Sequence, residues 1–127
     1  SAGRKNRVNG RRSITRRGQG VVQDTDQYSY EMHSSELSNK HFIPLVTTIK
    51  ARNESSSRAL VRHDGEEFIY VLSGVVILFT EYYAPAHLEP GDSCYFDSRM
   101  GHYLVSHGDE DATVMWVCSR VHPPLSG

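Results

Sequence analysis

The sequence lacks any apolar run that approaches the roughly 18 residues needed to cross a bilayer, which excludes a membrane-spanning helix. No apolar stretch follows the first residues, Ser1-Ala2-Gly3-Arg4-Lys5, so a secretory signal is not predicted either. Cysteine is scarce: Cys94 and Cys118 are the only two, and they form neither a Cys-x-x-Cys pair nor a zinc-finger spacing. We therefore expect two reduced thiols in a cytoplasmic protein rather than a disulfide framework.

Acidic residues are missing from the first 20 positions, which hold seven of the 14 Lys and Arg residues of this 127-residue chain. All 15 Asp and Glu residues follow, so the net charge of −1 hides a basic end on an acidic body. Residues 1–12 are predicted to be a basic linker or tail, and residues 13–127 a single domain. Because there is no initiator Met, we interpret the chain as processed or as a piece of a longer protein, with residues 1–3 a candidate tag remnant.

Helical patterns are nearly missing as well, and only Ser34–Leu37 is expected to form a short helical turn. Strand-like segments instead recur about every 8–12 residues with turn residues between them, which is typical of an all-β sandwich or small barrel. The expected strands are Tyr28–Met32, His41–Arg52, Phe68–Ser73, Val75–Thr80, Tyr82–Leu88, Ser93–Asp97, His102–Ser106 and Thr113–Ser119. Pro44 indicates that the second of these is an edge strand or carries a bulge.

Two of these strands are apolar on both faces. One face of the third strand carries Phe68, Tyr70 and Leu72 and the other carries Ile69, while the last strand is similar and carries Trp116. Both faces of such a strand must be covered, either by the N-terminal strands of the chain or by a second subunit. We expect a homodimer through the face that carries Tyr70, because a monomer this small would expose a large apolar patch.

The candidate site begins with His63 and Glu67, which lie four residues apart and so on the same side of an extended strand, with Gly65 allowing a bend between them. A buried carboxylate beside an imidazole needs neutralisation, which a divalent metal can supply. If the strands near 93–97 and 102–106 line the same barrel, His102 completes a set of two His and one carboxylate that suits Zn, Ni, Fe or Mn. A metal-free pocket is the alternative.

The segments that carry these residues resemble the two motifs of the cupin superfamily. They are His63–Gly74 and Gly91–His102, and the resemblance covers nearly the whole chain, most strongly residues 61–119. It implies a double-stranded β-helix, or jelly-roll barrel. Val61 stands where the first motif has its first His, so a fourth protein ligand is missing. The second motif departs as well, with Asp97, Arg99 and Ser106 at its Pro, Gly and Asn positions.

The residue pattern within the two motifs is similar to that of a narrower bacterial subgroup of cupins. The pattern His-x-Gly-Glu-Glu-Phe-x-Tyr-Val-Leu-x-Gly, followed by Pro-Gly-Asp-Ser-x-Tyr-Phe-Asp-Ser, resembles cupins that form the C-terminal sensor half of helix-turn-helix (XRE-like) transcriptional regulators. The Arg-rich stretch that ends in Ser13–Gly18 resembles the joint between the two halves. The resemblance implies a sensor of a small-molecule effector, joined to DNA through a separate N-terminal domain. Because this chain has no helix-turn-helix pattern, we expect it alone to bind DNA weakly and without sequence preference.

Within the barrel we expect Val61, Ile69, Tyr95 and Leu104 to line the effector pocket, with no catalytic residue. The main alternative is a small metal-dependent enzyme, a dioxygenase or an isomerase, built on the same three ligands. No acid–base pair beyond those ligands stands out in the sequence, which favours the sensor. A purely structural dimerisation module is the third hypothesis.

Overall fold

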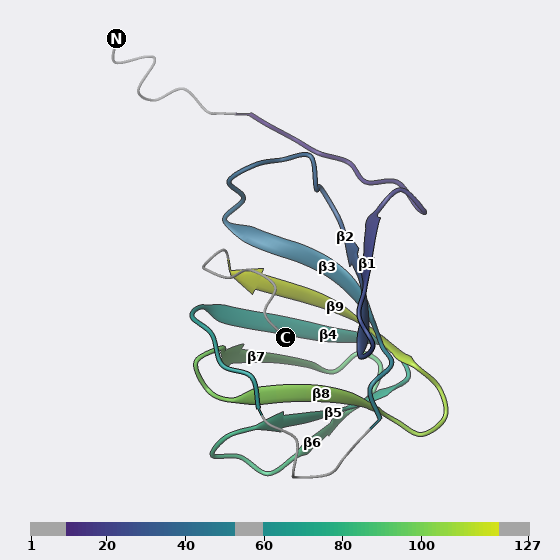
Figure 1. Ribbon diagram of the computed structural model, residues 1–127, viewed down its shortest axis with the longest axis vertical. Helices are drawn as coiled ribbons and strands as arrows, with labels where there is room; N and C mark the ends of the chain where they lie inside the picture. Colours follow the sequence, from purple (N-terminus) through teal and green to yellow (C-terminus); the bar gives the residue numbers. More distant parts are fainter. Residues whose placement is uncertain (1–9, 53–59, 120–127) are drawn as a thin grey trace.

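The computed structural model describes residues 10–52 and 60–119, and these residues form nine β-strands and no helix. The strands are β1 (Val21–Asp24), β2 (Tyr28–Met32), β3 (Phe42–Ile49), β4 (Glu66–Ser73), β5 (Val75–Thr80), β6 (Ala86–Leu88), β7 (Ser93–Asp97), β8 (His102–His107) and β9 (Ala112–Ser119). They make two antiparallel sheets, ordered β1-β2-β3-β9-β4-β7 and β6-β5-β8 (Figure 1). The expected all-β jelly-roll fold is confirmed. Among the described residues, no helix long and apolar enough to cross a membrane occurs.

The core lies between the two sheets because the strands of the larger sheet alternate buried and outward side chains. In β3, Ile43, Leu45, Thr47 and Ile49 are buried while the residues between them face outward. Strands β4 and β9 alternate in the same way, and the buried residues of both sheets join into one hydrophobic cluster. The large sheet therefore presents one inner face to the barrel and one outer face to its surroundings.

Pro44 does not mark an edge strand, because β3 lies between β2 and β9. Its carbonyl accepts a hydrogen bond from the backbone N–H of His33, just beyond the last paired residue of β2, Met32. The nitrogen of Pro44 faces the same side of the strand, so its missing N–H falls where the ladder with β2 has already ended. A proline is therefore tolerated inside a central strand.

Two expected strands are shorter than predicted, and the expected helical turn is not a helix. The strand predicted over His41–Arg52 is limited to β3 (Phe42–Ile49). The segment 82–88 is a strand only over β6, because Tyr82 has a left-handed φ of 70° and lies in the turn after β5. Tyr82 and Tyr83 are exposed at this tip rather than packed in a strand. Residues 34–37 form a turn closed by a hydrogen bond from the Leu37 N–H to the Ser34 carbonyl, and Ser34 itself has a φ of 56°. The short exposed strand β1 was not predicted.

Residues 10–20, here called the basic strap, run over the loop between β2 and β3 (Figure 1). The Arg11 guanidinium donates to the carbonyls of Ser38 and Asn39, at 2.6 and 3.1 Å. Thr15 Oγ1 accepts the Ser34 N–H at 2.7 Å, and Ser13 donates to the carboxylate of Glu36. Most of the predicted tail, residues 1–9, lies outside the described residues, so its boundary with the domain stays a prediction.

The outer face of the large sheet exposes apolar side chains. Tyr70 and Leu72 of β4 lie on it, with Met115 of β9 paired in register opposite Tyr70. Trp116, by contrast, points inward and is 7% exposed. The outer apolar surface is thus carried by β4 and by the alternate residues of β9.

Candidate metal centre

Three segments bring one side chain each to the same end of the barrel. Glu67 is the second residue of β4, and His102 is the first residue of β8. His63 lies in the loop before β4, and its N–H donates to the Ser98 carbonyl at 3.0 Å. A pair of backbone hydrogen bonds, each 3.0 Å, joins His102 to Val61, which holds the chain leading to His63 beside β8.

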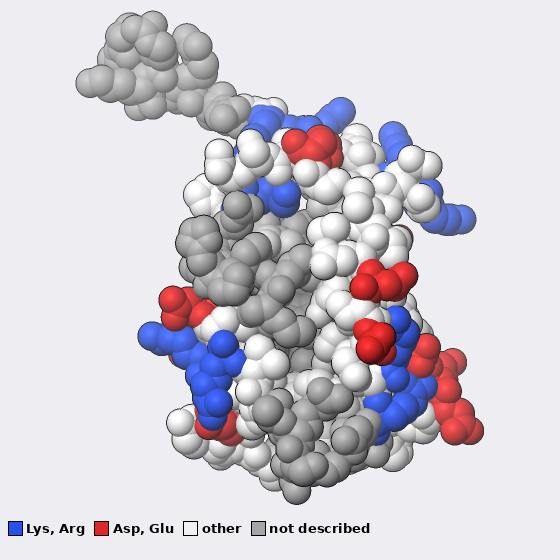
Figure 2. All heavy atoms as spheres, in the orientation of Figure 1, with Lys and Arg blue, Asp and Glu red and all other residues white. Residues whose placement is uncertain are grey.

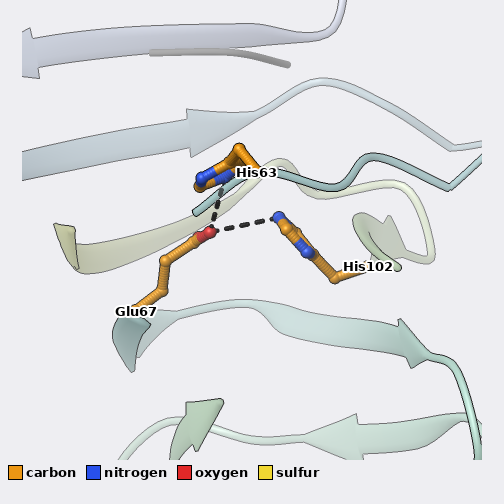
Figure 3. A group of neighbouring side chains, drawn as sticks. All are labelled: His63, Glu67 and His102. Atoms are coloured by element: carbon orange, nitrogen blue, oxygen red, sulfur yellow. Dashed lines mark ion pairs between the residues drawn. The ribbon is translucent and has the colours of Figure 1, made fainter. Parts of the chain in front are cut away.

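The three side chains converge on one carboxylate oxygen of Glu67 (Figure 3). Glu67 Oε2 lies 2.9 Å from His63 Nε2 and 3.1 Å from His102 Nε2. All three are withdrawn from solvent, with side-chain exposures of 1% for Glu67, 5% for His102 and 10% for His63. The predicted set of two imidazoles and one carboxylate is therefore assembled in the structure.

Both imidazoles are oriented by backbone carbonyls. Nδ1 of His63 lies 3.0 Å from the Asp64 carbonyl, and Nδ1 of His102 lies 2.9 Å from the Met100 carbonyl. A carbonyl can only accept, so each Nδ1 carries a proton, and in the neutral ring each Nε2 then presents a lone pair to the centre. This arrangement is the one that metal-binding histidines commonly have.

Glu67 is held by two further donors. Ser98 Oγ donates to Oε2 at 2.8 Å, and the indole Nε1 of Trp116 donates to Oε1 at 2.6 Å. Ser98 also fixes the loop of His63, because its N–H donates to the Gly65 carbonyl at 2.9 Å while its carbonyl accepts from His63. One buried serine thus positions two members of the group.

The protonation states of Glu67 and His102 are coupled. Burial strongly favours a raised pKa for the Glu67 carboxyl, but hydrogen bonds from His102, Ser98 and Trp116 outweigh it and leave that pKa below its ordinary value of 4.5. For His102, burial works to lower the pKa, and the contact with Glu67 reverses the effect and raises it above 6.5. Without a metal the pair therefore favours a carboxylate facing an imidazolium.

The donor set fits a divalent metal. Two lone-pair nitrogens and a carboxylate oxygen are acceptors, and three acceptors converge in a buried place only around a cation, either a proton or a metal. Two ligands at right angles on an ion about 2.1 Å away lie about 3.0 Å apart, which is close to the separations of 2.9 and 3.1 Å. Among the described residues this is the single group of three or more His, Cys, Asp or Glu side chains with ligand atoms within 4.8 Å of one another. A divalent metal such as Zn, Ni, Fe or Mn is thus supported.

Two of the four predicted pocket residues, Ile69 and Leu104, lie on the inner side, and a third, Val61, is half-buried. Ile69 and Leu104 follow Glu67 and His102 by two positions in their strands and are fully buried, and Val61 is bridged to His102. Tyr95 is a correction. It pairs with Phe68 on the outer face of the sheet, is 64% exposed and donates its hydroxyl to Glu66. That the other three contact an effector stays a prediction.

Sequence reasoning missed several residues that lie next to His63, Glu67 and His102. Phe96, not Tyr95, pairs with Glu67 across the sheet, and its ring centroid lies 5.0 Å from that of His102. Cys118 pairs with Glu67 on the other side, and burial together with Glu67 raises the pKa of its thiol to about 12. The alternation of side chains along β9 could be read from the sequence. No sequence spacing, however, indicated that Ser98 and Trp116 donate hydrogen bonds to Glu67.

Comparisons with known proteins agree with this fold. Residues 49–118 match a protein family described as "Cupin domain". Curated proteins of known function include none that matches the chain.

Several solved structures share the fold at low sequence identity. Hydroxypropylphosphonic acid epoxidase from S. wedmorenis is 21% identical, with a TM-score of 0.70 over 83% of this chain and 58% of its own, and a structure of FeII HppE also matches. Ectoine synthase from P. lautus is 21% identical, with a TM-score of 0.65 over 83% of this chain and 70% of its own. An RmlC-like cupin from Shewanella frigidimarina is 13% identical, with a TM-score of 0.67 over 87% of this chain and 92% of its own. The chain thus spans little more than half of the epoxidase, and these likenesses support the fold alone.

Proposed function

The chain belongs to the cupin domain family, and from that premise we propose that it binds one divalent metal and, on that metal, a small anionic molecule. The observation that carries the proposal is the convergence of His63, Glu67 and His102 on one buried point. When bound, the metal supplies open coordination positions to a ligand, because the chain offers three protein donors. Val61, at the place of a fourth donor in the cupin motif, leaves one more position free.

Charge selects an anion. Two neutral imidazoles and one carboxylate leave a divalent ion with a net charge of about +1 in a buried site, which is costly without a counter-charge. We therefore infer a ligand that coordinates through an anionic oxygen, such as a small carboxylate.

We further propose that this binding serves sensing in a cytoplasmic transcriptional regulator whose DNA-binding domain lies outside this chain. One support is the poor supply of proton-transfer groups. Burial, Cys118 and Glu67 raise the pKa of Tyr30 to about 12, and that of Cys118 is as high, so neither exchanges protons near neutrality. Two of the titratable groups described near the site thus supply no proton near neutrality, which suits recognition better than turnover.

A second support is the distribution of unpaired cations. Among described residues after position 40, every Lys and Arg is ion-paired to a carboxylate; these are Lys50, Arg52, Arg62 and Arg99. Among described residues up to position 40, no Lys or Arg forms an ion pair, and three of them, Arg12, Arg16 and Arg17, project exposed from the basic strap. Basic side chains gather at that end of the molecule in Figure 2. Such a surface suits the phosphates of DNA held by a neighbouring domain.

A metal-dependent enzyme is the second candidate. It is favoured by the open positions that three protein ligands leave on a metal, which suit the activation of a bound substrate or oxygen as well as simple binding. Two proteins of similar fold are named as enzymes, an epoxidase and a synthase.

Thermal unfolding of the metal-loaded chain tests the proposed anion site, and oxygen consumption separates the two functions. With Co(II) bound, acetate, oxalate and 2-oxoglutarate are each titrated, and at least one should raise the melting temperature by mass action on the folded state. The His102→Ala variant should show no such shift. If none of the anions stabilises the metal-loaded chain, the proposed anion site is wrong. Sustained oxygen consumption by the Fe(II)-loaded chain with any of them would replace the sensor with the enzyme.

A further inference from the structure

We propose that Trp116 is a positioning residue that makes Glu67 a one-oxygen ligand and so keeps a coordination position free for the anion. The inference rests on the metal site proposed above. It concerns the second carboxylate oxygen, Oε1, which does not face the two histidines.

The two oxygens of Glu67 have different partners. Oε2 faces both imidazoles and accepts from Ser98 Oγ, whereas Oε1 accepts the indole N–H of Trp116 at 2.6 Å. An indole nitrogen only donates hydrogen bonds, so in this contact Trp116 is the donor and Oε1 is the acceptor. The bond is buried, since Trp116 is 7% exposed and the Glu67 side chain 1%.

This bond decides how many oxygens the carboxylate offers. A carboxylate can bind a metal through one oxygen or through both. Binding through both would turn Oε1 toward the metal and leave the buried indole N–H without an acceptor, which is unfavourable. Glu67 therefore supplies Oε2 alone, and the position that Oε1 would take stays open.

The indole itself is held in place from several sides. Trp116 pairs across the sheet with Ile69 of β4 and Leu45 of β3, which fixes its place on the inner face. Tyr28 contacts its ring edge-on, with centroids 5.8 Å apart, and the Tyr30 ring lies 6.3 Å away. Because the Trp116 ring is held by these contacts, its indole N–H cannot move with Oε1 if the carboxylate turns. The packed core therefore restrains the orientation of the Glu67 carboxylate.

Trp116→Phe tests the inference, because it keeps an aromatic ring and removes the N–H. Co(II) is the metal probe and azide the anion probe. In the variant Oε1 is free to bind, so azide should bind about tenfold more weakly, and the visible spectrum of bound Co(II) should change with the altered coordination. The affinity for Co(II) itself should change less than the affinity for azide, since the lost orientation of Glu67 and the gained metal–oxygen bond act in opposite directions.

Tyr28→Phe is the matched control. It removes a buried hydroxyl that donates to the Leu104 carbonyl at 2.8 Å, and it keeps the ring that packs edge-on against Trp116. It should lower the melting temperature and leave the Co(II) spectrum and the azide affinity unchanged. Equal spectra and equal azide affinities in Trp116→Phe and the wild type would overturn the inference, whereas a wild type that binds no Co(II) would instead refute the metal site.

A measurement on the unmutated chain covers the case in which Trp116→Phe does not fold. The chain contains a single Trp, so its indole N–H gives one NMR signal. After saturation with Zn(II), that proton should stay protected from exchange with water. Loss of protection on addition of zinc would show that the bond to Oε1 breaks when the metal binds, and the proposed role of Trp116 would be wrong.

Discussion

Glu67 Oε2 is the atom around which the site is organised, because two imidazole nitrogens and one serine hydroxyl all face it. In the metal-free chain the raised pKa of His102 favours a proton on its imidazole as the cation at this point. A metal ion competes with that proton, so metal binding and acidity oppose each other here.

The metal-free chain should lose stability as the pH rises from 5.5 to 8.5. The raised pKa of His102 gives a contribution that is complete below its ordinary value of 6.5 and disappears as the pH rises through the folded value. The lowered pKa of Glu67 gives one that is present above 4.5 and lost as the pH falls through the folded value. The contributions of His102 and Glu67 to the free energy of unfolding are therefore both present between about pH 4.5 and 6.5.

Urea unfolding of the EDTA-treated chain measures this effect. The free energy of unfolding should fall over this pH range, because the contribution of His102 is lost as its imidazole is deprotonated. Glu67→Gln should flatten the dependence. A metal-free stability that rises toward pH 8.5 would contradict the assigned charge states.

At the scale of the elements, the turn between β4 and β5 determines how β4, the strand that carries Glu67, joins the smaller sheet. Gly74 has a φ of 75° there, and a Cβ on it would lie 2.7 Å from Ala112 Cα. Gly74→Ala should therefore destabilise the fold by at least about 2 kcal/mol, from backbone strain plus the clash. Gly108→Ala is the control, because Gly108 has a similar φ of 84° but no atom within 4 Å of the added carbon. Equal losses in chemical denaturation would show that the contact with Ala112 is unimportant.

The basic strap should make the chain's contact with DNA. Arg12, Arg16 and Arg17 changed together to Ala should weaken binding to a labelled 20-base-pair duplex and reduce the slope of log K against log salt by about 2.7, since each phosphate contact contributes about 0.9. Fluorescence anisotropy at several salt concentrations measures both. The control changes three ion-paired cations instead, Lys50, Arg52 and Arg99, and should leave the slope nearly unchanged. Equal effects of both triple variants would count against a specific role of the strap.

Sequence reasoning reached most of the strands, including β2, β5 and β7 with their bounds. It failed where the outcome depends on register or on a single dihedral angle. Tyr95 was assigned inward, but the pairing of Phe96 with Glu67 sends it outward. The left-handed φ of Tyr82 delays the start of the expected fifth strand, 82–88, and no local sequence pattern predicts that conformation.

The residues of the candidate site also differ in whether the sequence could predict them. His63, Glu67 and His102 were found because residue type and motif spacing carry their chemistry. Trp116 lies 49 residues from Glu67 in the chain, and its role appears only once β4 and β9 are paired. Contacts made by strand pairing across such distances leave no mark in local sequence.

At the scale of the whole molecule, we propose that the outer face of the large sheet pairs with a second copy of the chain. Tyr70, Leu72 and Met115 are 37%, 49% and 37% exposed on a continuous sheet face, and an isologous contact would bury the same residues in both copies. Sedimentation at micromolar concentration should give twice the chain mass of 14.3 kDa. Tyr70→Lys should shift the population toward monomer, because a charge would be forced into the contact.

Tyr83→Lys serves as the control for the dimer, since Tyr83 is 71% exposed at the tip between β5 and β6, away from that face. It should leave the mass unchanged. A wild-type mass of a single chain would refute the dimer and leave this face open to solvent.

The most direct test of the central claim is the ratio of metal to chain after loading with Co(II) and removal of the excess. We predict one ion per chain in the wild type and close to none in Glu67→Gln, His63→Ala and His102→Ala. The His87→Ala and His107→Ala variants should keep the full ratio, because those two imidazoles face each other 5.3 Å apart on the smaller sheet, outside the group of three. A wild type that retains no metal, or a Glu67→Gln variant that retains one ion per chain, would contradict the account.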